Sequence, residues 1–329
     1  MAIGASSALE VEDLETAFAT EEGTVVAVRG ISFRVGPGET LGLVGESGSG
    51  KSITALSIIR LLPASARIVG GRITLGEIDL LSLSQKEMRR VRGHRIGMVF
   101  QDSMTSLNPV LTVGRQITEA LEAHQGVPAG DARRRALELL EEVGVPEPER
   151  RLSQYPHQLS GGLRQRVAVA VALAPGPQVL IADEPTTALD VTIQAQLLEL
   201  LKHEQRARMM ALVLITHDLG VVAGMADTVA VMYAGRIVEV GPTRQLFTEP
   251  RHPYTVGLLE AVPRIDGQLR QRLPAIPGSP PPITELAVGC PFQPRCPLAL
   301  ERCETEIPAL EEVGEGHAAA CWSNVRETM

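Results

Sequence analysis

The stretch GESGSGKS, from Gly45 to Ser52, decides the fold. It matches the pattern G-x-x-x-x-G-K-[ST], and it follows a short apolar segment, TLGLVG (Thr40 to Gly45), that is typical of a buried strand. From Lys51 to Leu62 the apolar residues recur at helical spacing. A glycine-rich turn between a strand and a helix turns backbone N–H groups toward an anion. The sequence therefore predicts a phosphate-binding loop.

The residue types of this loop indicate a nucleoside triphosphate. Lys51 is expected to pair with the β- and γ-phosphates, and the Ser52 hydroxyl is expected to bind Mg²⁺. A flexible loop without a ligand is the alternative, which the flanking strand and helix disfavour. The other expected nucleotide contacts are Gly45, Ser47, Gly48, Ser49, Gly50 and Ile53.

A second apolar segment ends in two acidic residues, in VLIADEP, from Val179 to Pro185. A buried strand delivers the residues at its carboxyl end to the crevice of an α/β sheet. Asp183 fits the acid that binds Mg²⁺ in P-loop enzymes, and Glu184 fits a general base for the attacking water. Such acids often only cap a helix, but the phosphate-binding loop upstream favours the functional interpretation.

Short apolar segments alternate with segments of helical spacing along the first 240 residues, and this pattern predicts an α/β fold with a mainly parallel sheet. The expected strands cover residues 25–35, 95–100 and 211–216, with a strand pair around an Ala-Gly turn at 229–240. The expected helices cover residues 131–143, 163–174 and 192–208.

Composition limits the possible classes of protein. The chain has 329 residues, 44% of them hydrophobic, which is enough for one large core and a second module. No run approaches the roughly 18 apolar residues that a membrane span needs. The beginning of the sequence resembles no signal peptide, so we expect a cytosolic protein. The net charge of −8 weighs against a nucleic-acid partner.

A proline-dense stretch, PAIPGSPPP, from Pro274 to Pro282, reads as a stiff linker. The expected domains are a nucleotide-binding domain at 1–245, an extension with this linker at 246–282, and a cysteine module at 283–329.

The segment LSGGLRQR, from Leu159 to Arg166, predicts a second anion site. Ser160 is a helix N-cap residue, and Gly161 and Gly162 leave backbone N–H groups open at the helix start. A plain capped helix is the alternative.

With this segment the chain resembles the ATP-binding-cassette (ABC) ATPases, because LSGG is the signature of that family. The resemblance implies a RecA-like core, an antiparallel β subdomain and a helical subdomain that carries the signature. It also implies a head-to-tail dimer, in which Ser160, Gly161 and Gly162 contact the nucleotide of the partner chain. By the same resemblance, Phe18 stacks on adenine, Gln101 contacts Mg²⁺ and water, Asp190 lies in the D-loop, and His217 senses the γ-phosphate.

Two further stretches, VFQDSMTSLNPVLTVGRQI (Val99 to Ile117) and RHPYTVGLLEAVPR (Arg251 to Arg264), resemble the D-type ATPase of dipeptide and oligopeptide importers. The resemblance implies an ATPase that powers peptide uptake from the cytoplasmic side of the plasma membrane. The implied partners are a second, related ATPase, two permease subunits and an extracytoplasmic solute-binding protein. The stretch from Gln101 to Val113 is expected to receive a coupling helix of a permease.

Other functions stay open. Nickel, glutathione and antimicrobial-peptide transporters share these features. A non-transport ABC ATPase acting on DNA or ribosomes usually has two cassettes or a coiled-coil insertion, which this chain lacks. A redox enzyme built on the cysteines is disfavoured because the sequence has no flavin or nicotinamide fingerprint.

The four cysteines gather near the end of the sequence, in CPFQPRCPLALERC (Cys290 to Cys303) and at Cys321. Their spacing, C-x5-C-x6-C-x17-C, exceeds the short pairs of most zinc sites, and a reducing cytosol disfavours disulfides. Wider spacing and prolines beside Cys290 and Cys296 suit a [4Fe–4S] cluster, with Zn²⁺ and free thiols as alternatives. The resemblance to D-type subunits also suggests a cluster, with a structural role.

Overall fold

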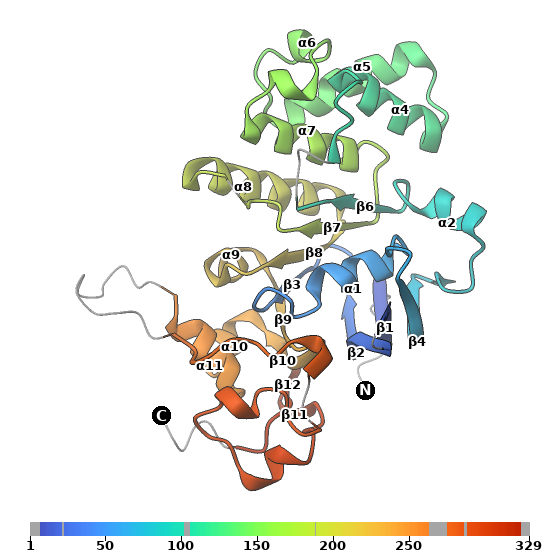
Figure 1. The fold of residues 1–329 in the computed structure, drawn as a ribbon. Coiled ribbons are helices and arrows are strands. Elements are labelled where there is room, and N and C mark those ends of the chain that lie inside the picture. The colour runs from blue at the N-terminus through green and yellow to red at the C-terminus, as the bar shows by residue number, and fades with distance from the viewer. Residues whose placement is uncertain are drawn as a thin grey trace. The chain divides into compact units, whose positions relative to one another are not determined.

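The computed structural model describes residues 7–21, 23–101, 106–187, 189–262, 275–285 and 288–323 (Figure 1). The chain divides into two compact units, which we describe separately. The first unit comprises Met1–Leu9, Val35–Glu39 and Leu75–Leu214. The second comprises Glu10–Arg34, Thr40–Thr74 and Ile215–Met329.

Three neighbouring strands form the sheet of the first unit, in the order β8-β7-β6. β6 (Ile96–Val99) and β7 (Val179–Asp183) run parallel, with Ile96 opposite Val179. Of β8 (Ala211–Thr216), the first four residues belong to this unit. Every residue of β7 and β8 is buried, which is typical of strands covered on both faces of a sheet.

The helices of the first unit include a cluster drawn in green in Figure 1, α4 to α7. Helix α7 buries seven of its 13 residues, mostly Ala and Val, so its neighbours can approach closely. A short strand, β5 (Ile78–Asp79), and a 3-10 turn, η1 (Pro156–Gln158), complete the unit. The helices are α2 (Gln85–Val91), α4 (Val113–Gln125), α5 (Ala129–Glu142), α6 (Pro148–Arg151), α7 (Gly161–Leu173) and α8 (Val191–Arg208).

The second unit contains a run of strands in the order β11-β12-β10-β9-β3. β3 (Thr40–Val44) is parallel to β9 (Thr228–Tyr233), and β9 forms a hairpin with β10 (Arg236–Pro242). From the cysteine segment, β12 (His317–Ala319) pairs with β10, and β11 (Glu311–Gly314) pairs with β12. Three further strands of this unit lie side by side in a second sheet: β2 (Gly23–Val35), β1 (Leu9–Thr20) and β4 (Ala66–Leu75).

The remaining elements of the second unit are short. Its helices are α1 (Lys51–Ile58), α9 (Leu219–Met225), α10 (Thr243–Thr248) and α11 (Pro253–Glu260). Its 3-10 turns are η2 (Ile283–Glu285), η3 (Gln293–Arg295) and η4 (Glu301–Glu304). Within the described part of the chain, no helix is long and apolar enough to cross a membrane.

The strands and helices predicted from periodicity are present within a few residues of their predicted ends. One difference is the helix after the phosphate-binding loop, which ends at Ile58 rather than Leu62. Arg60 has a φ of 52°, and this left-handed conformation ends the helix before Pro63 does. The predicted domain boundaries at 245 and 282 stay predictions, and residues 263–274 lie outside the described part.

Candidate functional site

The phosphate-binding loop lies in the second unit, between β3 and α1. Gly45 has a φ of 149°, and a side chain there would collide with the backbone oxygen of Met232. Gly50, the N-cap residue of α1, also has a positive φ, of 105°. Both glycines are therefore required by the backbone, and the predicted strand–loop–helix context is confirmed.

Lys51 folds back over this loop. Its side chain is buried, and its Nζ donates to the carbonyl oxygens of Gly45, at 2.7 Å, and Glu46, at 2.9 Å. Ser49 Oγ lies 3.3 Å from the same nitrogen. A cation surrounded by loop oxygens is suitably placed for phosphate oxygens to take over these contacts. Of the other predicted residues, Ser47 and Gly48 are exposed, whereas Ser52 and Ile53 are partly buried.

Glu46, which sequence reasoning missed, connects this loop to the C-terminal region of the same unit. Its backbone N–H donates to Tyr254 Oη, at 2.8 Å. Its carboxylate accepts two hydrogen bonds from Arg295, at 2.6 and 3.0 Å. The side-chain hydrogen bonds to Glu46 raise the pKa of Arg295 further, so the guanidinium stays charged. These contacts join residues more than 200 positions apart, which no local pattern could have indicated.

The first unit brings together two residues of the predicted hydrolytic group. Asp183 ends β7 and is buried, and Glu184 follows it with a φ of 45°. Gln101 Nε2 donates to Glu184 Oε2, at 2.8 Å. Thr187 Oγ1 donates to the same oxygen, also at 2.8 Å, and was not predicted to contact it. A carboxylate fixed by two donors beside a buried acid is suited to orienting water.

The LSGG segment starts α7 in the first unit. The Ser160 side chain accepts from the Leu163 N–H, at 3.4 Å, and therefore caps the helix as predicted. A side chain at Gly161 would meet open space, whereas one at Gly162 would collide with Ile193 of α8. The helix start thus leaves one glycine free to face a ligand, and packs the other against α8.

A cavity of about 500 Å³ opens beside this helix start. Ser160, Gly161 and Gly162 line it together with Asp190, so the structure brings the LSGG segment and the predicted D-loop residue together. Asp190 also caps α8 by accepting the Ile193 N–H, at 3.0 Å. Ala188, within that D-loop, lies outside the described residues.

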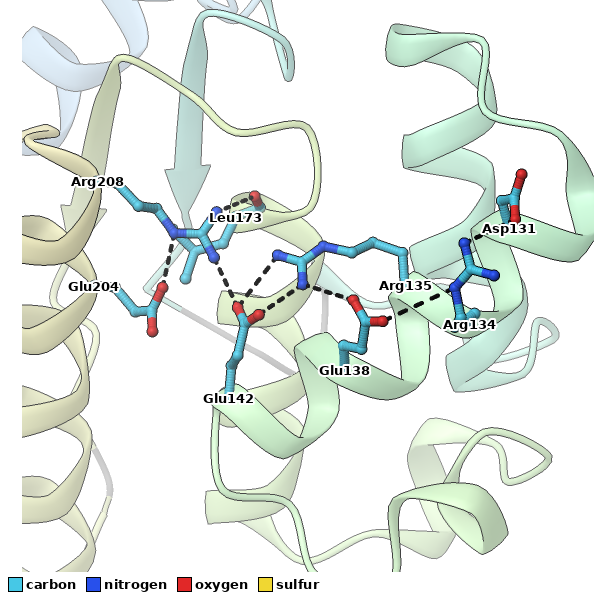
Figure 2. Close-up of polar contacts among 8 residues, drawn as sticks. All are labelled: Asp131, Arg134, Arg135, Glu138, Glu142, Leu173, Glu204 and Arg208. Atoms are coloured by element: carbon cyan, nitrogen blue, oxygen red, sulfur yellow. Dashed lines mark hydrogen bonds and ion pairs between the residues drawn. The ribbon is translucent and has the colours of Figure 1, made fainter.

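Charged side chains link helices of the first unit to one another (Figure 2). At the end of α5, the carboxylate of Glu142 accepts from Arg135, at 2.6 Å, and from Arg208 at the end of α8, at 2.8 Å. Arg208 also pairs with Glu204, at 2.7 Å, and donates to the carbonyl of Leu173, the last residue of α7. The network therefore joins the ends of three helices.

The two remaining predicted nucleotide residues lie in the second unit. Phe18 is partly buried on β1. His217 is exposed and follows β8, directly before Asp218, whose carboxylate caps α9 by accepting the Gly220 N–H, at 2.8 Å. The structure thus places the phosphate-binding loop, Phe18 and His217 in one unit, and Gln101, Asp183, Glu184 and the LSGG segment in the other.

The four thiols lie in the second unit, and none forms a disulfide. Burial raises the pKa of Cys296 to about 11, and the thiols of Cys290, Cys303 and Cys321 raise it too. Burial and the neighbouring thiols also raise the pKa of Cys290 and of Cys321. The backbone N–H of Cys290 donates to the carbonyl of Cys303, at 2.8 Å. The four cysteines predicted to act together are therefore close enough to interact electrostatically.

This arrangement does not amount to a site for a metal ion. Among the residues described, no group of three or more His, Cys, Asp or Glu side chains could hold one. A cluster of several irons is larger than one ion, so its cysteine ligands lie further apart than those of a single ion. The predicted [4Fe–4S] cluster stays a prediction.

Comparison with known proteins decides the family. Residues 28–187 match the family described as ABC transporter, and residues 238–303 match the family described as oligopeptide/dipeptide transporter, C-terminal region. The chain is 54% identical to the probable peptide ABC transporter ATP-binding protein y4tR of Sinorhizobium fredii, over 95% of this chain and 94% of that protein. The chain belongs to the ABC transporter ATPase family.

Two other matches agree with this assignment. The dipeptide transport ATP-binding protein DppD of Bacillus subtilis is 52% identical, over 95% of this chain and 94% of that protein. Among solved structures, the ATP-binding cassette MJ0796, a dimer bound to ADP and phosphate, is 29% identical with a TM-score of 0.65. That match covers 72% of this chain and 99% of the cassette. The fold is the ABC ATPase cassette, and the protein is an ABC-type ATPase.

Proposed function

We propose that this ABC ATPase powers the import of dipeptides or oligopeptides across the plasma membrane, from its cytoplasmic side. The match of residues 238–303 to the oligopeptide/dipeptide transporter C-terminal region carries this proposal. The names of relatives about 50% identical to the chain support it. Two permease subunits and a second, related ATPase complete the proposed complex, and a solute-binding protein delivers the peptide.

In the proposed mechanism, ATP binds between the phosphate-binding loop of one chain and the LSGG segment of the other. Lys51 would neutralise the β- and γ-phosphates, and Ser52, Gln101 and Asp183 are the residues that would hold Mg²⁺. Glu184 accepts a proton from the attacking water, and His217 contacts the γ-phosphate. The remaining loop residues from Gly45 to Ile53 cradle the phosphates, Phe18 stacks on adenine, and Asp190 contacts the partner chain.

ATP then acts as a ligand that favours the closed dimer, and hydrolysis removes it and reopens the dimer. The segment 101–113 is proposed to pass this change to a permease. Residues 102–105 of that segment lie outside the described part of the chain.

Affinity purification of the tagged chain from detergent-solubilised membranes tests the assignment. We expect two permease proteins and a second ATPase to co-purify. In proteoliposomes with these partners and the binding protein, ATP should drive uptake of a labelled dipeptide or oligopeptide. Uptake of Ni²⁺ or glutathione instead would show that the proposed substrate class is wrong. Recovery of ribosomes or nucleic acid would show that the protein is not a transporter subunit.

We further propose that Cys290, Cys296, Cys303 and Cys321 hold a [4Fe–4S] cluster within a C-terminal module at 283–329. The mutual interaction of the four thiols supports this. When bound, the cluster would supply iron–thiolate bonds that cross-link a segment with little core of its own. Zn²⁺, the alternative metal, is disfavoured because no group of three or more His, Cys, Asp or Glu side chains among the described residues could hold a single ion.

Metal analysis of anaerobically purified protein tests this proposal. We expect about four irons per chain and an absorption band at about 400 nm. Replacing any one of the four cysteines by Ser should remove the colour. Colourless protein with one zinc per chain would contradict the cluster.

A further inference from the structure

Glu46 is held on three sides within the second unit. Tyr254 Oη accepts a hydrogen bond from its backbone N–H, and Lys51 Nζ donates to its carbonyl oxygen. Arg295 binds its carboxylate through both terminal nitrogens. The second residue of the phosphate-binding loop is thus fixed by the loop's own lysine and by two residues from the C-terminal region.

The guanidinium of Arg295 donates five hydrogen bonds. Its side chain is only 5% exposed, and its Nε donates to the carbonyl of Pro277, at 2.8 Å. Nη1 donates to Glu46 and weakly to Tyr233 Oη, and Nη2 donates to Glu46 and weakly to the carbonyl of Gly278. An arginine has five N–H groups, and a lysine could reproduce neither their number nor their planar geometry.

The position of Arg295 depends on the loop between the first two cysteines. The residue ends the turn η3, its N–H donates to the carbonyl of Phe292, and Cys296 follows it directly. The Phe292 ring packs edge-on against Tyr233, with ring centroids 5.3 Å apart, and lies tilted against Tyr254, with centroids 5.4 Å apart. The conformation of the cysteine loop and the packing of Phe292 against the two tyrosines therefore determine where the guanidinium meets Glu46.

We propose that Arg295 is a positioning residue for the phosphate-binding loop, through which the loop Cys290–Cys296 and bound ATP stabilise one another. This rests on the proposed role of the phosphate-binding loop, and it assigns to the cysteine loop an effect on the nucleotide. A loop already held in its binding conformation loses less freedom when the ligand arrives.

The effect must also run in the opposite direction. If an ordered cysteine loop favours nucleotide binding, then bound nucleotide favours the ordered cysteine loop by the same factor. Amide hydrogen exchange in residues 290–303 of the wild-type full chain should therefore slow when ATP binds. This measurement needs no variant.

Nucleotide affinity of the full chain, measured with a fluorescent ATP analogue, tests the contact directly. Arg295→Gln and Glu46→Gln should each weaken binding about tenfold, and the double variant should be no weaker than either single one, because both changes remove one interaction. Arg295→Lys should lie between the wild type and Arg295→Gln. Arg72→Gln, which removes an exposed pair with Glu12 in the same unit, is the matched control and should bind normally.

The outcomes separate this proposal from the proposed function. Normal affinity in Arg295→Gln, additive effects in the double variant, or hydrogen exchange that ATP leaves unchanged would each overturn the role of Arg295. Lys51→Ala serves as the reference, because it should abolish binding whatever Arg295 does. Retained binding in Lys51→Ala would instead overturn the assignment of the phosphate-binding loop itself.

Discussion

Glu184 combines a carboxylate held by two donors with a left-handed backbone conformation. Its Oε2 accepts hydrogen bonds from both Gln101 and Thr187, and its backbone has a φ of 45°. A non-glycine residue in the left-handed region is uncommon, and functional sites are one place where such residues cluster. The two donors hold the carboxylate in one direction, as a base that must face a single water molecule requires.

Glu184→Gln should therefore bind ATP with nearly normal affinity and hydrolyse it about 10² to 10⁴ times more slowly, since general-base catalysis contributes about that much. ATPase assays of the assembled transporter, with the partner ATPase unchanged, measure this. Glu141→Gln, which changes an exposed glutamate on α5, is the control and should leave the rate unchanged. A hydrolysis rate of Glu184→Gln close to that of the wild type would show that Glu184 is not the general base.

His252 should make stability depend on pH. Its buried Nδ1 accepts the N–H of Tyr254, and burial lowers the pKa of His252 to about 4, despite the opposing effect of Glu239. Between pH 6.5 and pH 4 the unfolded chain therefore binds a proton that the folded chain does not, so stability falls as the pH falls. From pH 7 to pH 5 we expect a loss of about 2 kcal/mol from this residue.

Urea unfolding at both pH values, compared with His252→Asn, isolates this contribution. Asn keeps an acceptor at the N-terminus of α11 but does not titrate, so the variant should lose about 2 kcal/mol less between the two pH values. Equal losses in the two proteins would mean that His252 is not the titrating group.

At the scale of helices, Glu142 is the acceptor shared by α5 and α8 (Figure 2). Glu142→Ala should lower the free energy of unfolding by about 1 kcal/mol, a modest value because the paired side chains are 22–35% exposed. Arg134→Ala, on the more exposed side of the same network, should change it by less than about 0.5 kcal/mol. Thermal or urea unfolding measures both, and equal effects would show that the shared acceptor adds nothing.

Part of the secondary structure was predictable because local patterns determine it, whereas β1, β4 and α4 were not among the predicted elements. Buried strands such as β7 and β8 appear as short apolar runs, and Ser160 and Asp190 mark the starts of α7 and α8. The hairpin β11–β12 was missed, since all four residues of β11 are exposed and its sequence, EEVG, has no strand alternation. Its pairing with β12 comes from tertiary contacts instead.

The candidate site was predictable to the extent that it is made of motifs. The phosphate-binding loop lies between a strand and a helix, as its motif predicts, and Gln101, which the family resemblance singles out, contacts Glu184. Glu46, Tyr254 and Arg295 were not predictable, because their contacts span more than 200 residues. Nothing in the periodicity of a sequence encodes such a pairing.

At the scale of the whole molecule, the LSGG segment is proposed to act on the nucleotide of the partner chain. Ser160→Arg should therefore abolish ATP turnover by the assembled transporter but leave ATP affinity of the isolated chain normal. Fluorescent-nucleotide titration and ATPase assays measure the two quantities. Ser153→Arg, at another exposed serine of the first unit, is the control. A loss of affinity in the isolated Ser160→Arg chain as large as that in Lys51→Ala would argue against the partner-chain role.

The pairing of Arg295 with Glu46 can form only late in synthesis of the nascent chain. The two residues are separated by 249 positions, so a ribosome adding about 5 to 20 residues per second needs roughly 10 to 50 s to travel from one to the other. During that interval the phosphate-binding loop has already been synthesised but has no guanidinium to hold it. A messenger truncated before the codon for Arg295 would yield a chain that contains every residue of the loop yet never acquires its support.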